Sequence, residues 1–368
     1  MKLYSNEIVF KGHPDKLCDR ISDSILDAYL AQDPYTRAGI ETMGGKGKIF
    51  VTGEVTSKGE VDITSIVHRI LKDADLDVNA YEIINNIGLQ SADIALGVDM
   101  SIEGKDGVLA EDEAIGAGDQ GMMFGYACNE TDLYVPKAMA ILQEFSRTYE
   151  AMRKKNPDLF YADGKAQITG YYDDEFRLTK IKTFTISYQN SETDREFTDH
   201  LIKTAAEMIC YKNKVEVEEF LINPTGKFLI GSFDGDAGLT GRKIVVDSYQ
   251  SFAPVGGGAF SGKDPTKVDR SGAYKARQLA IRTLKKYNLK WCEIQLSYAI
   301  GKAEPLAIYI DSDKGNLEVP AEWYKECTPA NMIKDLKLRQ PIYEETACFG
   351  HFGCPPDAFG RRFSWEQA

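Results

Sequence analysis

The sequence has no long apolar run, no paired cysteine motif and no excess of basic residues. No stretch approaches the roughly 18–20 apolar residues that span a bilayer, and the first residues lack the apolar core of a signal peptide. We therefore expect no membrane segment. The seven cysteines are scattered without a C-x-x-C pair, which favours a reducing, cytoplasmic location. Lys plus Arg number 44 against 56 Asp plus Glu, and this net charge of −12 argues against a nucleic-acid partner.

One short segment near the C-terminus carries three soft metal ligands, Cys348, His351 and Cys354. A structural zinc ion needs four ligands, and the nearest other cysteine, Cys327, lies far back in the sequence. The sequence therefore favours two buried thiols around a structural histidine over a zinc site.

The chain is longer than one hydrophobic core usually allows, so we expect two or three domains. Three stretches each combine alternating strands with an amphipathic helix, which indicates an α+β fold of mixed sheets covered by helices. The expected elements are a strand at 48–57 with a helix at 62–71, strands at 166–172 and 180–188 with a helix at 195–211, and a helix at 265–287 with strands at 292–300 and 305–310.

The segment 97–118 differs from these stretches because it is rich in Gly, Asp and Glu and has little periodicity. A loop of this length is typical of a lid or a linker. We predict an N-terminal domain at 1–98, a mobile gate loop at 99–118, a central domain at 119–230 and a C-terminal domain at 231–368.

The first candidate site is the motif GHPDK at 12–16. Pro14 suits the first position of a helix, which places His13 at a helix N-terminus that favours anions. Asp15 and Asp19 are four residues apart, and such a like-charge pair destabilises a helix unless something neutralises it. A divalent cation would neutralise the pair, but these residues alone favour a solvated acidic first turn over a metal site.

The second candidate is the glycine-rich segment 256–270, which matches most of a Walker A loop. Asp264 stands where that loop needs Ser or Thr, so we predict instead that Asp264 caps a helix beginning at Pro265. The cap would bring two cations and one carboxylate to the helix mouth, namely Lys263, Lys267 and Asp269.

Two further glycine-containing motifs lie at 116–125 and 234–243. The second ends in Arg242 and Lys243, ahead of an expected β-branched strand at 244–246. Together with Lys165, Lys263 and Lys267, these residues supply enough cations for a polyphosphate.

Read together, the motifs resemble the S-adenosylmethionine synthetase (methionine adenosyltransferase) family. GHPDK, GAGDQG, INPTG, GDAGLTGRK, GGGAFSGKDPTKVDRS, SYAIG and GHFG follow in the family's order from residue 12 to residue 353. The resemblance implies three similar α+β domains in a pseudo-threefold arrangement. It also implies a homodimer with active sites between subunits, possibly assembled as a dimer of dimers.

The resemblance also implies residue roles. The catalytic residues would be His13, Lys165, Arg242, Lys243 and Lys263. ATP would contact these five together with Asp163, Lys227, Phe228, Asp236 and Ala259. Methionine would be bound by Glu54, Gln90, Asp119, Asp236 and Lys267. Two Mg²⁺ ions per site would involve Asp15 and Asp269, and a K⁺ ion would involve Glu41.

The implied reaction joins ATP and L-methionine by attack of the sulfur on ribose C5′, followed by hydrolysis of the bound triphosphate to pyrophosphate and phosphate. A thioether sulfur carries no proton, so this attack needs no general base, and the sequence offers no convincing nucleophile–base triad. Fixed cations would stabilise the leaving triphosphate.

Two alternatives stay open from the sequence. The glycine loop could belong to another nucleotide-dependent phosphotransferase, although Asp264 argues against it, or the chain could be a non-catalytic pseudoenzyme subunit. Lys11 and Lys227 depart from the residues commoner at these positions in the family, and Lys227 lacks the planar guanidinium of the usual arginine.

Overall fold

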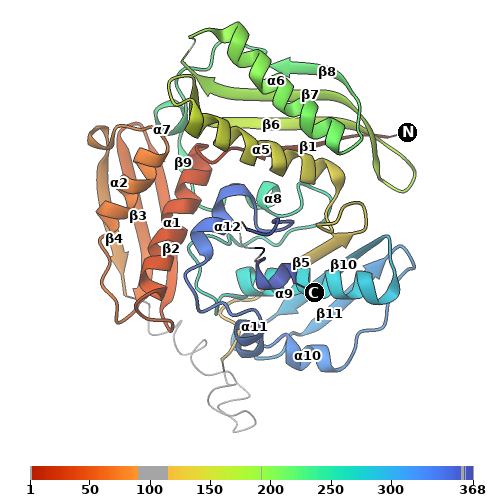
Figure 1. Cartoon of the computed structure of the whole chain (residues 1–368). Helices are drawn as coiled ribbons and strands as arrows, with labels where there is room; N and C mark the ends of the chain where they lie inside the picture. The colour runs from red at the N-terminus through yellow and green to blue at the C-terminus, as the bar shows by residue number, and fades with distance from the viewer. Residues whose placement is uncertain (1, 90–114, 192, 358–359, 361, 368) are drawn as a thin grey trace.

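The computed structural model describes residues 2–89, 115–191, 193–357, 360 and 362–367. Three β-sheets lie around a central set of helices, with one sheet toward each of three corners of the molecule (Figure 1). The predicted three-domain α+β fold of mixed sheets and helices is confirmed.

The first sheet has the strand order β4-β3-β2-β9 and contains β2 (Arg37–Gly45), β3 (Lys48–Thr56), β4 (Glu82–Gly88) and the short β9 (Gly238–Leu239). Helices α1 (Pro14–Leu30) and α2 (Ile63–Asp73) belong to this part of the fold, and a 3-10 turn at Val78–Ala80 precedes β4. β3 and β4 are parallel, whereas the other pairs are antiparallel.

The second sheet has the order β1-β6-β7-β8, with β1 (Lys2–Val9), β6 (Phe160–Tyr172), β7 (Leu178–Asn190) and β8 (Val217–Ile222). Two long helices, α5 (Lys137–Lys155) and α6 (Arg195–Lys212), pack on one face of this sheet (Figure 1). Its aromatic core includes Phe10 stacked on Tyr149, with ring centroids 4.3 Å apart.

The third sheet, β11-β10-β5, is antiparallel and contains β5 (Gly121–Cys128), β10 (Trp291–Tyr298) and β11 (Ala307–Ser312). Helix α9 (Val268–Tyr287) packs against β5 and β10. The remaining short elements are α7 (Ser232–Gly235), α8 (Ile244–Asp247), α10 (Glu322–Glu326), α11 (Pro329–Asp335), α12 (Tyr343–Phe349) and a 3-10 turn at Ser364–Glu366.

Each sheet includes a strand that is distant in sequence from its neighbours. β1 pairs with β6, β9 pairs with β2, and β5 pairs with β10. One hydrophobic core joins the first and third sheets, and a second core lies between the second sheet and its two helices, α5 and α6. Whether the chain divides into folding units at the boundaries drawn from the sequence stays a prediction.

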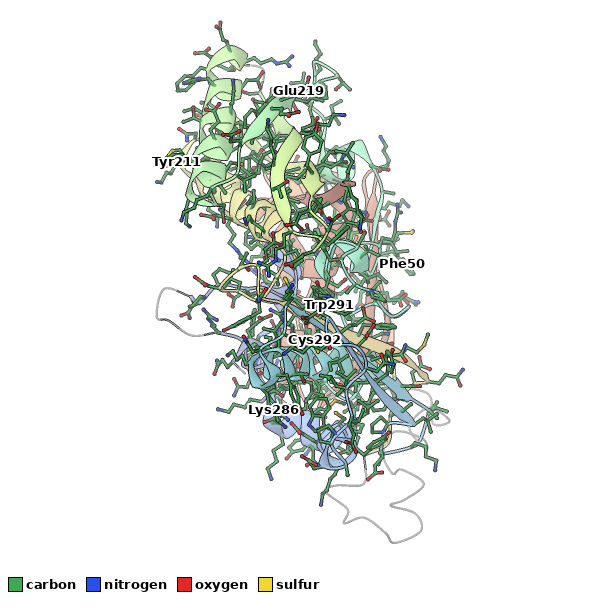
Figure 2. All side chains as sticks on the ribbon, turned by 90° about the vertical axis from the view of Figure 1, so that its right-hand side faces the viewer. Phe50, Tyr211, Glu219, Lys286, Trp291 and Cys292 are labelled. Carbon is green, nitrogen blue, oxygen red and sulfur yellow. The ribbon has the colours of Figure 1, made fainter. Side chains whose placement is uncertain are left out.

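The first sheet buries only one of its faces. On β2 and β3, the side chains of Ile40 and Val51 lie on the buried face of the sheet. Met43 and its cross-strand partner Phe50 lie on the opposite face, where Met43 is 54% exposed. Figure 2 shows Phe50 at the edge of the molecule. Because cross-strand partners share a face, a set of polar and apolar side chains lies on the open face of this sheet.

Two local predictions are wrong. Residues 244–246 form the start of α8 rather than a strand, because Asp247 N–H bonds Lys243 O at 2.8 Å and Asp247 is anchored by Lys16. Helix α9 begins at Val268 rather than at Pro265, because Asp264 and Lys267 close a separate turn before the helix starts. Tertiary contacts decide the local structure at both places.

Candidate active site

His13 stands at the N-terminus of α1, as the sequence predicted, with Pro14 in the first turn. The Nδ1 atom of His13 accepts a hydrogen bond from Asp15 N–H at 3.2 Å. Burial, reinforced by the positive charges of Lys243 and Lys165, lowers the pKa of His13 to about 3. The ring is therefore neutral near pH 7, and its Nε2 atom carries the proton as a hydrogen-bond donor.

Asp15 is almost completely buried beside His13 and binds both β9 and the segment that follows it. Its Oδ1 atom accepts Leu239 N–H at 2.9 Å, and its Oδ2 atom lies 2.5 Å from Lys243 Nζ. Arg242 Nε lies 3.4 Å from Oδ1. Burial alone would raise the pKa of Asp15, but the hydrogen bonds from Lys243 and Leu239 outweigh it and lower the pKa. We call His13, Asp15, Lys165, Arg242 and Lys243 the His13 group.

Glycine permits this close approach. A Cβ atom on Gly238 would lie 2.2 Å from Pro14 O, so no other residue fits there without a backbone shift. The chain can then bring Leu239 N–H to the Asp15 carboxylate.

Three further aspartates follow Asp15 at four-residue spacing along α1. Asp19 accepts Gly241 N–H and Asp23 accepts Gly262 N–H, each at 2.8 Å, and Asp27 accepts the N–H groups of Tyr343 and Glu344. The four carboxylates therefore fix three later segments of the chain against one face of α1. The like-charge repulsion predicted for Asp15 and Asp19 is relieved by backbone donors and cations of the chain itself.

Lys16 and Asp247 were not assigned roles from the sequence, yet they support the site. Lys16 is buried and its Nζ atom lies 3.0 Å from Asp19 Oδ2 and in closer contact with Asp247 Oδ2. Burial would lower the pKa of Lys16, but the two carboxylates outweigh it and raise the pKa. Lys16 lies within the first motif, but its pairing with Asp247 is a long-range contact that leaves no local pattern.

The predicted nucleotide residues lie on β6 and on loops beside the His13 group. Asp163 is buried, and its Oδ2 atom accepts Ser232 N–H at 2.7 Å, while Ser232 Oγ donates to Gly12 O at 2.7 Å. Burial raises the pKa of Asp163 to about 6. Phe228 O accepts Asn190 N–H at 3.0 Å, which fixes the loop that leads to Ser232. Ser232 thus ties this loop to GHPDK, a role that the sequence did not reveal.

Lys227 and Asp236 lie on the surface of the same region. Asp236 accepts its neighbour Ala237 N–H at 2.8 Å. Ala259 reaches this region from the glycine-rich segment, because a Cβ atom on Gly241 would lie 2.5 Å from Ala259 Cβ.

Three predicted residues, Lys263, Lys267 and Asp269, lie at the start of α9. Together with Glu54 and Asp119 we call them the Lys263 group. Lys263 Nζ contacts Asp269 Oδ2, and Gly258 packs directly on the Asp269 carboxylate. The backbone of Gly39 on β2 forms an isolated antiparallel β-bridge with Lys263, and Gly39 is also the cross-strand partner of Glu54 on β3. Gly39 therefore connects Glu54 to Lys263. Asp119 is exposed just ahead of β5.

Asp264 is fully buried. Its Oδ2 atom accepts Ala38 N–H at 2.9 Å and pairs with Lys267 Nζ at 3.2 Å, while its Oδ1 atom accepts both the N–H and the hydroxyl of Thr266. Burial would raise the pKa of Asp264, but Lys267 and Arg37 outweigh it and lower the pKa. Asp264 therefore fastens the glycine-rich segment to β2 instead of capping α9.

The His13 group and the Lys263 group are attached to different turns of α1. Asp15 holds the first and Asp23 holds the segment of the second, and eight residues of helix correspond to about 12 Å. Glu41, Glu54 and Lys165 all lie on strand faces that the helices leave open. Gln90 and most of the predicted gate lie outside the described residues.

Cys348, His351 and Cys354 are buried. The Nδ1 atom of His351 and the Tyr274 hydroxyl are 2.7 Å apart, and each thiol contacts a backbone carbonyl.

Lys11, which precedes GHPDK, forms an ion pair with Asp73 at 2.7 Å. Within the described parts of the chain, no helix has both the length and the apolarity needed to span a membrane.

Comparison with known protein families accounts for nearly the whole chain. Residues 1–95 match the N-terminal domain of S-adenosylmethionine synthetase, residues 114–228 match its central domain, and residues 230–367 match its C-terminal domain. The chain therefore belongs to the S-adenosylmethionine synthetase family, whose activity is that of a methionine adenosyltransferase.

Proposed function

We propose that the chain makes S-adenosylmethionine by attack of the methionine sulfur on C5′ of ATP, and that it then hydrolyses the bound triphosphate to pyrophosphate and phosphate. One observation carries the proposal. Two candidate phosphate-binding lysines are ion-paired with the two candidate metal carboxylates, Lys243 with Asp15 and Lys263 with Asp269. When the triphosphate binds with Mg²⁺, its negative charges can replace the aspartates as partners of the lysines, and Mg²⁺ can replace the lysines as partner of the aspartates. No charged side chain is then left without an opposite charge.

His13 would act on the leaving group as a neutral donor. Its Nδ1 atom is occupied by Asp15 N–H, so Nε2–H is the atom available to an oxygen of the triphosphate. The lowered pKa of His13 keeps this arrangement unchanged across the physiological range. A positioned donor at an oxygen that gains negative charge stabilises the transition state.

Lys165, Arg242 and Lys243 would surround the triphosphate from one side and Lys263 from the other. Asp163, Lys227, Phe228, Asp236 and Ala259 would border the nucleotide. Glu54, Gln90, Asp119, Asp236 and Lys267 would bind methionine. Asp163 and Phe228 lie on strands or loops that hydrogen bonds tie to GHPDK, which supports a preformed nucleotide site.

The donor set suits Mg²⁺. No group of three or more His, Cys, Asp or Glu side chains is arranged to hold a metal among the described residues, but Mg²⁺ is usually bound by one or two carboxylates plus substrate phosphates and water. Asp15 and Asp269 would each supply a carboxylate oxygen, and Glu41 would serve K⁺. Bound Mg²⁺ would neutralise the charge that develops on the triphosphate.

The reaction needs no activated nucleophile from the protein. All seven cysteines are buried, and burial raises the pKa of each thiol whose surroundings are described, for example that of Cys292 to about 12. Such thiols are inert. The sulfur of methionine attacks through a lone pair, so the chain has only to orient it and stabilise the leaving group.

The separation of the two residue groups supports a homodimer in which the His13 group of one subunit faces the Lys263 group of the other. Members of both groups, Lys165 and Glu54, lie on open sheet faces, which are the surfaces that a partner subunit can cover. Assembly as a dimer of dimers is compatible with the same arrangement, and the seven free cysteines support the proposal of a cytoplasmic location.

Product analysis tests the activity. Purified protein is incubated with ATP, methionine, Mg²⁺ and K⁺, and the products are separated by mass spectrometry. The proposal predicts a sulfonium product together with pyrophosphate and phosphate in equal amounts. ADP accumulating without methionine would instead indicate a phosphotransferase, and a folded, assembled protein without any turnover would indicate a pseudoenzyme.

A further inference from the structure

The loop between β8 and α7, residues 223–231, contains Lys227 and Phe228 and leads directly to Ser232, the first residue of α7. We call it the nucleotide loop. Ser232 is only 1% exposed and has a φ of 51°, a left-handed region that residues other than glycine and asparagine rarely adopt. A serine keeps this conformation only where its surroundings impose it. The contacts of Ser232 therefore decide what this residue does.

Ser232 joins three segments that are far apart in the sequence. Its Oγ atom donates a hydrogen bond to Gly12 O at 2.7 Å, and its N–H group donates to Asp163 Oδ2 at 2.7 Å. Gly12 O belongs to the peptide group that ends at His13 N. One buried serine therefore connects the nucleotide loop both to the peptide group of His13 and to β6.

The three segments are packed without space between them. A Cβ atom on Gly231 would lie 2.6 Å from Gln189 Oε1 and 2.9 Å from Asp163 Cβ. A Cβ atom on Gly12 would lie 2.3 Å from Ala162 Cβ. Since no side chain fits at either glycine, the backbones approach one another as closely as sterics allow. The Ser232 hydroxyl is thus a direct link between closely packed segments.

His13 is held in place by other contacts as well. Gly12 N–H donates to Ala162 O at 3.1 Å, and His13 N–H donates to Phe10 O at 3.0 Å. Loss of the Ser232 hydroxyl would therefore leave the start of α1 where it is. What the loss would release is the nucleotide loop, which would no longer be fastened to His13.

We propose that Ser232 is a positioning residue that sets the nucleotide loop relative to His13 and so aligns the two halves of ATP. The proposal rests on the proposed function, in which this loop borders the nucleotide and His13 donates to the leaving triphosphate. The bond that breaks joins the adenosine half to the triphosphate half. Because small misplacements of reacting groups slow a reaction strongly, the two halves have to be held in a fixed relation. The Ser232 hydroxyl supplies a link between the residues that hold them.

The test uses two substitutions that remove the same hydroxyl but differ in their effect on stability. Ser232→Gly relieves the backbone strain and should keep the melting temperature near that of the wild type. Ser232→Ala loses the same hydrogen bond without this relief, so it should melt at a lower temperature. Ser251→Gly is the matched control, because Ser251 also has a positive φ, 75°, and is exposed. All variants are studied as full-length, assembled protein.

We expect both Ser232 variants to lower kcat/KM for ATP about tenfold, the effect of one hydrogen bond. The KM for methionine should be unchanged, and so should the hydrolysis of added tripolyphosphate, which lacks adenosine. Ser251→Gly should match the wild type. Unchanged kcat/KM for ATP, or equal losses with ATP and with tripolyphosphate, overturns the proposal. A loss in Ser232→Ala that is absent in Ser232→Gly overturns it too, because activity would then follow stability.

A binding measurement separates this proposal from the proposed function. Titration calorimetry of ATP and of pyrophosphate, each with Mg²⁺ and without methionine, reports on the link even if no sulfonium product forms. Weaker binding of ATP by Ser232→Gly than by Ser251→Gly, with equal binding of pyrophosphate, supports the positioning role. Equal binding of ATP by the two variants, or equal weakening for both ligands, rejects it, whatever reaction the chain catalyses.

Discussion

Asp15 combines two tasks at one buried carboxylate. It fixes β9 through Leu239 N–H and it pairs with Lys243 and Arg242. An asparagine at this position could still accept the backbone hydrogen bond through its amide oxygen, but it would lose the charge that positions the two cations. The two tasks can therefore be separated by one isosteric change.

We predict that Asp15→Asn lowers kcat/KM by about 10²–10³, the effect of removing one electrostatic contribution to a preorganised site, while the fold is retained. Steady-state kinetics and circular dichroism measure the two effects. Asp62→Asn is the matched control, because Asp62 is an exposed N-cap of α2 far from the site. Near-normal synthesis by Asp15→Asn would remove this carboxylate from the catalytic machinery.

Lys263 is partly exposed and pairs only with Asp269 among the contacts described. We predict that Lys263→Ala lowers kcat about 100-fold and shifts the melting temperature by only a few degrees, because a partly exposed ion pair contributes about 0–1 kcal/mol to stability. Lys212→Ala, which breaks an exposed pair with Glu144, provides the control. A sharp fall in melting temperature with normal activity per folded molecule would make Lys263 a structural residue.

At the scale of elements, α1 organises the molecule. Its aspartates at positions 15, 19, 23 and 27 bind loops from three later parts of the sequence, and Asp23 also pairs with the buried Arg270 at 2.7 and 2.8 Å. Because a buried carboxylate without a hydrogen-bond or ionic partner destabilises the fold, each of these four aspartates needs such a partner. The helix therefore fixes the positions of both residue groups at once.

Asp27 differs from the other three because backbone N–H groups are its only hydrogen-bond partners that we describe. Burial raises the pKa of Asp27 to about 7, whereas an unfolded aspartate has a pKa near about 3.9. The folded protein thus binds more protons between about pH 4 and pH 7, and the contribution of Asp27 to stability falls as pH rises through this window.

We predict that Asp27→Asn, which cannot titrate, becomes more stable relative to the wild type between pH 5 and pH 8, by about 1–3 kcal/mol. Urea unfolding at several pH values measures the difference. The exposed Asp33→Asn should leave the pH dependence of the wild type nearly unchanged over the same window. A wild-type and Asp27→Asn difference that is constant with pH would contradict the raised pKa.

Local sequence patterns predicted most of the elements, and the misses share one cause. Helical spacing of apolar residues located α1, α2 and α6, and His13 and Pro14 gave the start of α1. The pattern failed at α8 and at the start of α9, where buried Asp247 and Asp264 are fixed by partners far away in sequence. A buried carboxylate and its distant cation leave no periodic signal.

The site residues were likewise predictable only where local features mark them. Motifs located His13, Asp15, Lys243, Lys263 and Asp269, because glycine turns and helix starts are local features. They did not reveal that the lysines and aspartates pair with one another or that Ser232 ties a loop to Gly12. These facts depend on which loops α1 and β1 bring together.

At the scale of the whole molecule, the proposed homodimer requires a surface for the partner subunit, and we propose the open face of the first sheet. Phe50 and Met43 are cross-strand neighbours there. In Figure 2, Phe50 and Tyr211 appear on opposite sides of the molecule, and Tyr211 is 87% exposed on α6. The pair offers a direct comparison between an interface candidate and an exposed aromatic residue elsewhere.

We predict that Phe50→Glu weakens self-association at least about tenfold and lowers activity in proportion, because a carboxylate would be buried in the interface. Analytical ultracentrifugation and activity across a dilution series measure both. Tyr211→Glu should leave both unchanged. If Phe50→Glu assembles and turns over like the wild type, the active site does not require this face.

The most direct test follows the bond that breaks. ATP carrying ¹⁸O between C5′ and the α-phosphorus is incubated with methionine, Mg²⁺, K⁺ and the assembled protein, and all products are analysed by mass spectrometry. Sulfur attack at C5′ predicts unlabelled S-adenosylmethionine, with the label retained in the phosphate products. Label retained on the adenosine part, or phosphate release without any sulfonium product, would contradict the account.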